Sequence, residues 1–140
     1  MQVLHSIQAT ATGGRSGWVV SVDGALKVKL AKATSLGGAG GADASPEHLL
    51  AAAYAASFLD GLRKAAAESG QALTDDANVT VTVGVGRPDG EDGLALDVAL
   101  SLDLPDFDHE AVRALARRAH ALCPYSRALR ERLEPRTSMT

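Results

Sequence analysis

The stretch SPEHLLAAAYAASFLDGL, residues 45–62, predicts a long helix that organises the rest of the chain. It opens with a serine that can cap the first turn, a proline that suits the first helical position, and Glu47 at the positive end of the helix dipole. From residue 49 to residue 62 the side chains are apolar on almost every side, so we expect burial on most sides. Gly70 fits the end of this helix.

Alternating apolar residues before the helix predict strands. Residues 3–11 alternate up to the glycines at 13 and 14, and a second pair of alternating runs covers residues 18–22 and 26–30. Asp23-Gly24 separates the second pair, and this dipeptide tolerates the positive φ angles of a tight turn. We therefore predict a β-hairpin here, followed by an irregular glycine-rich loop, LGGAGG, at residues 36–41.

The second half of the chain repeats the order of strands and then helix. Valines at alternate positions in 79–85 and leucines at alternate positions in 94–104 predict two strands with one buried face. An amphipathic helix follows and ends at Cys123, because Pro124 disfavours helical angles at the residue before it. The tail, residues 127–140, is ambiguous, and its pattern suggests a helical turn followed by a short final strand.

This order of elements predicts an α+β fold, with N-terminal and central antiparallel β-meanders around a long buried helix. We expect a single domain over residues 1–140, since this length suits one hydrophobic core. Two small sheets hardly cover a helix that is apolar on all sides. The pattern therefore favours a homodimer in which the helices of two subunits pack centrally.

The composition excludes several classes of protein. The net charge is −3 and basic residues form no run, which argues against a nucleic-acid partner. The apolar runs are too short for a membrane span, so we expect no membrane partner. A single cysteine, Cys123, cannot form a disulfide within the chain and suggests a reducing, cytoplasmic location.

Few residues suggest chemistry by themselves. Cys123 is either a buried structural thiol or a partner thiol, because the negative end of a helix opposes a thiolate. Arg15 can equally be a solvated turn residue, and Ser57 lacks the surroundings of a hydrolase nucleophile. The four histidines show no spacing typical of metal ligands, so we expect no metal.

Five segments of the chain form a combination that is more specific than any one of them. They are ATGGRSG, VSVDGALKVKL, LGGAGG, SPEHLLAAAYAASFLDGL and HALCPYS, and their order and spacing cover residues 9–126. Taken together they resemble the organic hydroperoxide resistance (Ohr) proteins of the OsmC/Ohr family.

The resemblance implies the OsmC/Ohr-like fold as an intertwined homodimer, and a thiol-dependent peroxidase. In such proteins a peroxidatic cysteine attacks an alkyl or fatty-acid hydroperoxide, releases the alcohol and becomes a sulfenic acid. Cys123 matches the resolving cysteine that condenses with it. Arg15 matches the arginine that orients the thiolate and the peroxide, and Glu47 matches the glutamate that holds this arginine by a bidentate ion pair. No cofactor is bound, since a dihydrolipoyl thiol on a lipoylated protein serves as the external reductant.

Ser57 occupies the position of the peroxidatic cysteine, and this is the main departure from the family. A serine hydroxyl is far less acidic than a thiol, so Arg15 cannot activate it in the same way. Two explanations stay open: an engineered replacement of cysteine, or a natural pseudoenzyme that binds hydroperoxides or other small apolar ligands. Glu47 and Ser57 are ten residues apart, about 15 Å along a helix, which favours a site at a subunit interface.

Overall fold

The computed structural model describes residues 1–130 and 136–139. The chain divides into two compact units, Met1–Leu49 and Leu50–Thr140. Unit 1 contains β1 (Ala9–Thr12), the 3-10 turn η1 (Gly14–Ser16), β2 (Trp18–Ser21), β3 (Lys27–Lys29) and the 3-10 turn η2 (Thr34–Leu36). Helix α1 (Pro46–Glu68) begins in unit 1, and unit 2 contains its remainder with β4 (Asn78–Gly86), β5 (Ala95–Asp103), α2 (His109–Leu122), α3 (Pro124–Leu129) and β6 (Arg136–Met139).

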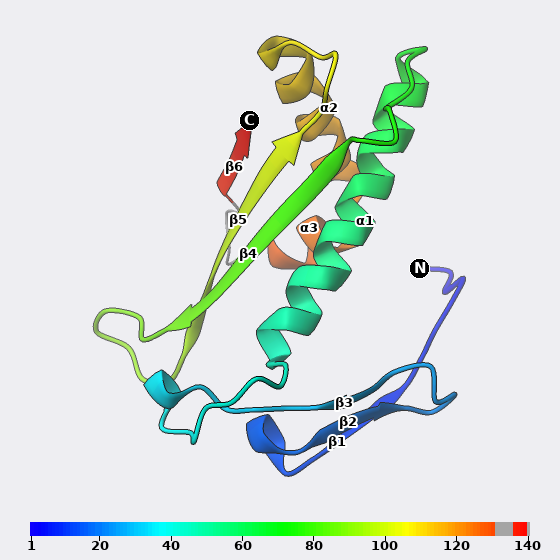
Figure 1. The fold of residues 1–140 in the computed structure, drawn as a ribbon. Coiled ribbons are helices and arrows are strands. Elements are labelled where there is room, and N and C mark those ends of the chain that lie inside the picture. The colour runs from blue at the N-terminus through cyan, green and yellow to red at the C-terminus, as the bar shows by residue number, and fades with distance from the viewer. Residues whose placement is uncertain (131–135, 140) are drawn as a thin grey trace. The chain divides into compact units, whose positions relative to one another are not determined.

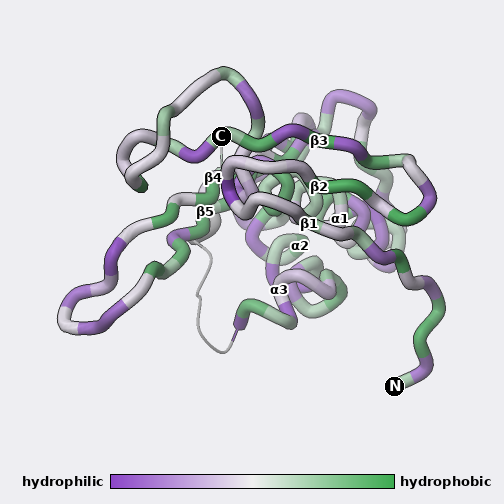
Figure 2. Tube along the Cα trace, turned by 90° about the horizontal axis from the view of Figure 1, so that it is seen from below, coloured by the Kyte–Doolittle hydropathy of each residue, from purple (hydrophilic) through white to green (hydrophobic). Residues whose placement is uncertain are grey.

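Unit 1 is built on an antiparallel sheet in the order β1-β2-β3. The predicted hairpin is confirmed: Trp18 pairs with Lys29, and Gly24 in the turn has a φ of 74°. Asp23 stabilises the turn by accepting bonds from the Ser21 hydroxyl at 2.6 Å and from the Ala25 backbone N–H at 3.0 Å. Figure 2 shows hydrophobic and hydrophilic residues mixed along the strands of this sheet.

The predicted first strand is too long. The alternation suggested a strand over residues 3–11, but β1 covers only Ala9–Thr12. Its partner β2 continues into the Asp23-Gly24 turn, so the residues before position 8 have no strand to pair with. Val3 and Ile7 are correspondingly exposed, because alternation alone stabilises a strand only where one face is buried.

Unit 2 packs helices against one sheet, whose order is β4-β5-β6 (Figure 1). The predicted pairing of the valine and leucine strands is confirmed, with Val81 opposite Leu100 in an antiparallel register. The helical turn and the final strand suggested for the tail correspond to the end of α3 and to β6, although α3 begins earlier than the tail, at Pro124, and residues 131–135 and 140 lie outside the described part. Strand β6 runs parallel to β5, so the sheet is mixed rather than wholly antiparallel.

The core of unit 2 lies between α1, α2 and the inner face of β5. Tyr54, Phe58 and Leu62 on α1 are fully buried, as are Val98, Leu100 and Leu102 on β5 to within 1%. Burial of α1 on most sides was predicted, but within this chain one side is buried, while Ala52 and Ala56 are exposed. Methyl side chains make this second side apolar without giving it much area to bury.

Helices α1 and α2 approach each other closely at a glycine. A Cβ atom at Gly61 would lie 3.3 Å from the backbone oxygen of Ala119, which is closer than ordinary contact. Asp108 caps α2 by accepting a bond from the Ala111 backbone N–H at 2.8 Å. Among the described residues no helix has the length and apolar content needed to cross a bilayer.

Replacing Leu100 by alanine tests the core. Leu100 is 1% exposed at the centre of the second sheet, so L100A should lower the free energy of unfolding by about 2–5 kcal/mol. Thr82 is exposed on the neighbouring strand, and T82A should change it by less than about 1 kcal/mol. Urea unfolding followed by circular dichroism measures both, and similar losses for the two variants would contradict this assignment of the core.

Candidate functional site

Cys123 and Ser57 lie side by side in unit 2. The Cys123 thiol points at the Ser57 hydroxyl with a distance of 3.6 Å between Sγ and Oγ. Ser57 is half-buried on α1, and Cys123 is 1% exposed. The two residues flank the close approach of Gly61 and Ala119, since each lies four residues from that point along its own helix. The packing of α1 against α2 therefore fixes this contact.

Cys123 occupies the junction of two helices. It ends α2, with its backbone N–H bonded to the Ala119 oxygen at 2.8 Å, and its φ of −79° and ψ of 123° match the conformation expected before Pro124. It also precedes α3, whose Arg127 N–H bonds to the Cys123 oxygen at 3.1 Å. The sequence placed this thiol only at a helix C-terminus and suggested the next helical turn from residue 127 on, so the start of α3 directly after Cys123 was missed.

A buried chain of hydrogen bonds supports the segment that carries Cys123. The Tyr54 hydroxyl lies 2.8 Å from the Ser126 hydroxyl, which in turn lies 2.9 Å from Nδ1 of His120. Tyr54 is fully buried and Ser126 is 4% exposed. These hydrogen bonds join α1, α2 and α3. Two of their residues, His120 and Ser126, lie three residues before and three residues after Cys123.

Aromatic contacts enclose the same region. The ring of Phe58 meets the His120 ring edge-on, with 4.7 Å between centroids. Tyr54 stacks on Tyr125 at 5.9 Å and contacts Phe58 edge-on at 6.2 Å. The Cys123 thiol thus lies among side chains that exclude water and that hold one another in place.

Burial shifts the pKa values of His120 and Tyr54, which belong to these hydrogen bonds, toward their neutral forms. It lowers the pKa of His120 below 6.5, and the charge of Arg130 lowers it further. Burial also raises the pKa of Tyr54, with the Ser126 hydrogen bond opposing this shift and the neighbouring Cys123 reinforcing it. A neutral His120 lets the Ser126 hydroxyl donate to Nδ1 while it accepts from Tyr54, which satisfies all three groups.

Arg15 and Glu47 form an ion pair in unit 1. The Nη1 atom of Arg15 lies 2.8 Å from Oε1 and 3.0 Å from Oε2 of Glu47. The side chains are 30% and 14% exposed, respectively. One guanidinium nitrogen thus contacts both carboxylate oxygens, whereas the sequence suggested a bidentate pair. Partial burial opposes ionisation of Glu47, but the hydrogen bond and charge of Arg15 outweigh it and leave the Glu47 pKa below its ordinary value.

Local backbone structure positions this ion pair. Arg15 lies in the 3-10 turn η1, and Gly17 ends that turn where a Cβ atom would clash with the Thr12 oxygen. Glu47 lies in the first turn of α1, where Ser45 and His48 bond reciprocally: Ser45 N–H donates to His48 Nδ1 at 3.0 Å, and His48 N–H donates to the Ser45 hydroxyl at 3.4 Å. His48 thereby takes the role of the glutamate in a capping box.

The structure brings the predicted site residues together as two pairs. Arg15 with Glu47 belongs to unit 1, and Ser57 with Cys123 belongs to unit 2. Their meeting at a subunit interface stays a prediction. Sequence reasoning missed Tyr54 and Ser126, and it considered His120 only as a metal ligand. The serine of CPYS was the available signal, since a buried hydroxyl there requires partners. In the described part of the chain, no three His, Cys, Asp or Glu residues are grouped to hold a metal ion.

Comparison with known proteins identifies the family. Residues 38–138 match the OsmC-like protein family. The organic hydroperoxide resistance protein of Xanthomonas axonopodis pv. citri is 40% identical over 133 residues, which cover 95% of this chain and 92% of that protein. The organic hydroperoxide resistance protein OhrB of Bacillus subtilis is 34% identical, with 91% of each chain covered.

The chain belongs to the OsmC/Ohr family. A solved structure agrees: the organic hydroperoxide resistance protein OsmC of Legionella pneumophila superposes with a TM-score of 0.89 at 36% identity, covering 99% of both chains. The resemblance seen in the sequence is therefore confirmed, together with the OsmC/Ohr-like α+β fold. These relatives are named for organic hydroperoxide resistance, which indicates a peroxidase-type family.

The protonation of His120 makes stability depend on pH. Its folded pKa lies below the unfolded value of 6.5, so the unfolded chain binds more protons as the pH falls past 6.5. Protonated Nδ1 would donate to Ser126, and one of the two hydroxyl protons, that of Ser126 or that of Tyr54, would then lose its acceptor among these three groups. The free energy of unfolding should therefore fall on acidification, by at most about 1.4 kcal/mol per pH unit for this group.

Urea unfolding between about pH 7.5 and 5.5 measures this effect. The variant H120Q retains an acceptor for Ser126 but does not titrate, so its loss of stability over this range should be smaller. H109Q at the exposed start of α2 is the matched control and should keep the original dependence. An unchanged pH dependence in H120Q would contradict the assigned role of His120.

Proposed function

We propose that this fold is a thiol-dependent organic hydroperoxide reductase whose attacking atom belongs at position 57. The observation that carries the proposal is the 3.6 Å contact between Cys123 Sγ and Ser57 Oγ. A disulfide requires a distance of about 2.0 Å between its two sulfur atoms. Two side chains that are already in contact need only a small rotation to reach this distance. The contact matches the roles that the family resemblance assigns to these two positions.

The reaction proceeds in three balanced steps. A thiolate at position 57 attacks the O–O bond of an alkyl or fatty-acid hydroperoxide, so the sulfur becomes a sulfenic acid and the alkoxide takes a proton to leave as the alcohol. The Cys123 thiol then condenses with the sulfenic acid to form the disulfide and water. A dihydrolipoyl dithiol on a lipoylated protein reduces this disulfide by exchange, becomes a cyclic disulfide and returns both thiols.

Arg15 and Glu47 serve the first step. The guanidinium favours a thiolate over a thiol and donates to the peroxide oxygens, while Glu47 holds the guanidinium in place. The ionised state of Glu47, with its lowered pKa, keeps this ion pair intact at neutral pH. No cofactor takes part, because the electrons come from the external dithiol.

Ser57 removes the attacking sulfur from this chain. Its hydroxyl accepts a bond from Cys123, no hydrogen bond joins it to a basic side chain of the described residues, and an alcohol oxygen forms no product equivalent to a sulfenic acid. The chain as it stands is therefore without turnover. Its remaining function is to bind organic hydroperoxides or other small apolar ligands, if Ser57 is the natural residue.

A homodimer accounts for the apolar surface of unit 1. Leu30 is the one buried hydrophobic residue in Met1–Leu49, while Trp18, Val20 and Val22 are exposed. Three short strands without a core are marginal by themselves. A second copy that covers this sheet and the alanine side of α1 would supply the missing burial. Sedimentation equilibrium should give twice the chain mass, and a monomer at micromolar concentration would contradict this assembly.

Replacing Ser57 by cysteine tests the proposed reaction. S57C should gain peroxidase turnover with cumene hydroperoxide and dihydrolipoamide, and the original chain should show none. Turnover should exceed that with hydrogen peroxide, because the aromatic side chains of Tyr54 and Phe58, close to position 57 on α1, belong to the apolar core. The double variant S57C/C123S cannot form the disulfide between positions 57 and 123, so it should no longer be regenerated by dithiol exchange. The variant S57C/R15Q should lose the attack of the thiolate on the hydroperoxide. Normal turnover in the original chain, or none in S57C, would refute the proposal.

A further inference from the structure

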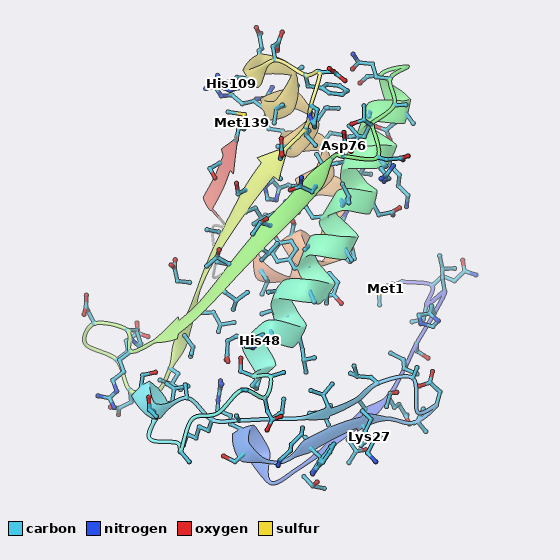
Figure 3. All side chains as sticks on the ribbon, viewed as in Figure 1. Met1, Lys27, His48, Asp76, His109 and Met139 are labelled. Atoms are coloured by element: carbon cyan, nitrogen blue, oxygen red, sulfur yellow. The ribbon has the colours of Figure 1, made fainter. Side chains whose placement is uncertain are left out.

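A groove on unit 2 lies between α2 and β6, apart from the thiol. Its lining residues, which we call the α2 groove, are Arg113, Ala116, Arg117, His120 and Met139. The four α2 residues follow a spacing of three and four, so they share one side of the helix. Met139 completes the groove from β6, whose end lies beside α2 in Figure 3. The enclosed volume is about 250 Å³, enough for a small side chain from outside.

The α2 groove carries positive charge that the described residues do not neutralise. Arg113 and Arg117 are one helical turn apart, and neither has an ion-pair partner within residues 1–130 and 136–139. Like charges at this spacing destabilise a helix. The neighbouring Arg118 is different, because its Nε and Nη2 atoms bond to Glu68 at 2.7 and 3.0 Å.

The chemistry of the groove selects its occupant. Two guanidinium groups present a planar array of donors that matches a carboxylate, and Ala116 and Met139 offer apolar contact to the methylene groups behind it. An aspartate or glutamate side chain has this combination of a charged end and a short apolar stem.

The position of the groove relates it to the thiol. It follows α2 toward the end at which Cys123 lies, and Arg117 precedes Cys123 by about 9 Å along the axis. His120 belongs to both places, since it lines the groove and bonds to Ser126 in the CPYS segment. An acidic group held in the groove would keep whatever carries it close to Cys123.

We propose that the α2 groove docks an acidic side chain of the protein that carries the reducing dithiol. This inference rests on the proposed function and names the docking surface for its last step. Arg113 and Arg117 bind the carboxylate and orient the carrier, whose dithiol then exchanges with the disulfide between positions 57 and 123. Both electrons come from the carrier's dithiol, which leaves as a cyclic disulfide.

The experiment compares two reductants on the S57C protein. One is free dihydrolipoamide, and the other is an isolated lipoylated domain with acidic residues beside its lipoyl-lysine. The variant R113A/R117A should lower the ratio of kcat/KM for the domain to kcat/KM for dihydrolipoamide about tenfold, which corresponds to about 1.4 kcal/mol. The loss should appear in KM and should shrink at high salt, because exposed charges are screened. R118A, whose arginine is already paired with Glu68, should leave the ratio unchanged.

The outcomes separate the docking surface from the reaction. Equal kcat/KM ratios in R113A/R117A and its parent would overturn the docking proposal while leaving the peroxidase chemistry in place. Absence of turnover with free dihydrolipoamide in S57C would refute the reaction itself. Binding of the lipoylated domain to the original Ser57 chain, measured by titration calorimetry, is independent of turnover. Weaker binding in R113A/R117A but not in R118A supports the proposal, and equal binding in all three proteins overturns it.

Discussion

The close approach of α1 and α2 at Gly61 and Ala119 is the constraint on which the site depends. A Cβ atom at position 61 would lie 3.3 Å from the Ala119 oxygen, which is tighter than ordinary contact, so a side chain here would push the two helices apart by a few tenths of an ångström. Four residues from this point on each helix, Ser57 and Cys123 come into contact at 3.6 Å. The edge-on contact between Phe58 on α1 and His120 on α2 holds the same two helices together. Residues 66 positions apart in the sequence thus become neighbours through helix packing rather than through a local motif.

The surroundings of the thiol are built to hold it still and dry. Tyr54, Ser126 and His120 tie three helices together through one buried and one partly buried hydrogen bond, and a neutral His120 lets Ser126 donate to Nδ1 while it accepts from Tyr54. The Arg15–Glu47 pair is prepared in a similar way by the turns around it. Under the proposed function, Arg15 and Glu47 orient the reaction, Cys123 resolves it, and the atom at position 57 decides between turnover and binding alone.

The sequence predicted the elements better than it predicted their relations. Strict alternation at 79–85 and the caps of α1 gave correct strands and a correct helix, because these signals are local. The alternation before Ala9 misled, since a strand needs a partner and β2 has already turned away. The Ser57–Cys123 pairing came from family resemblance, and no spacing rule could have derived it. Tyr54 and the α2 groove depend on which helix faces become neighbours, and that depends on contacts distant in sequence.

The most direct test of the account is stoichiometric oxidation of the S57C protein. The protein is first reduced and freed of the reductant, it is then treated with one equivalent of cumene hydroperoxide, and free thiols are counted by alkylation and mass spectrometry. If position 57 holds the attacking atom and Cys123 the resolving one, both thiols disappear together and a peptide linked between positions 57 and 123 appears. A stable sulfenic acid at position 57 with Cys123 still alkylatable would contradict the pairing, as would two thiols that survive unchanged.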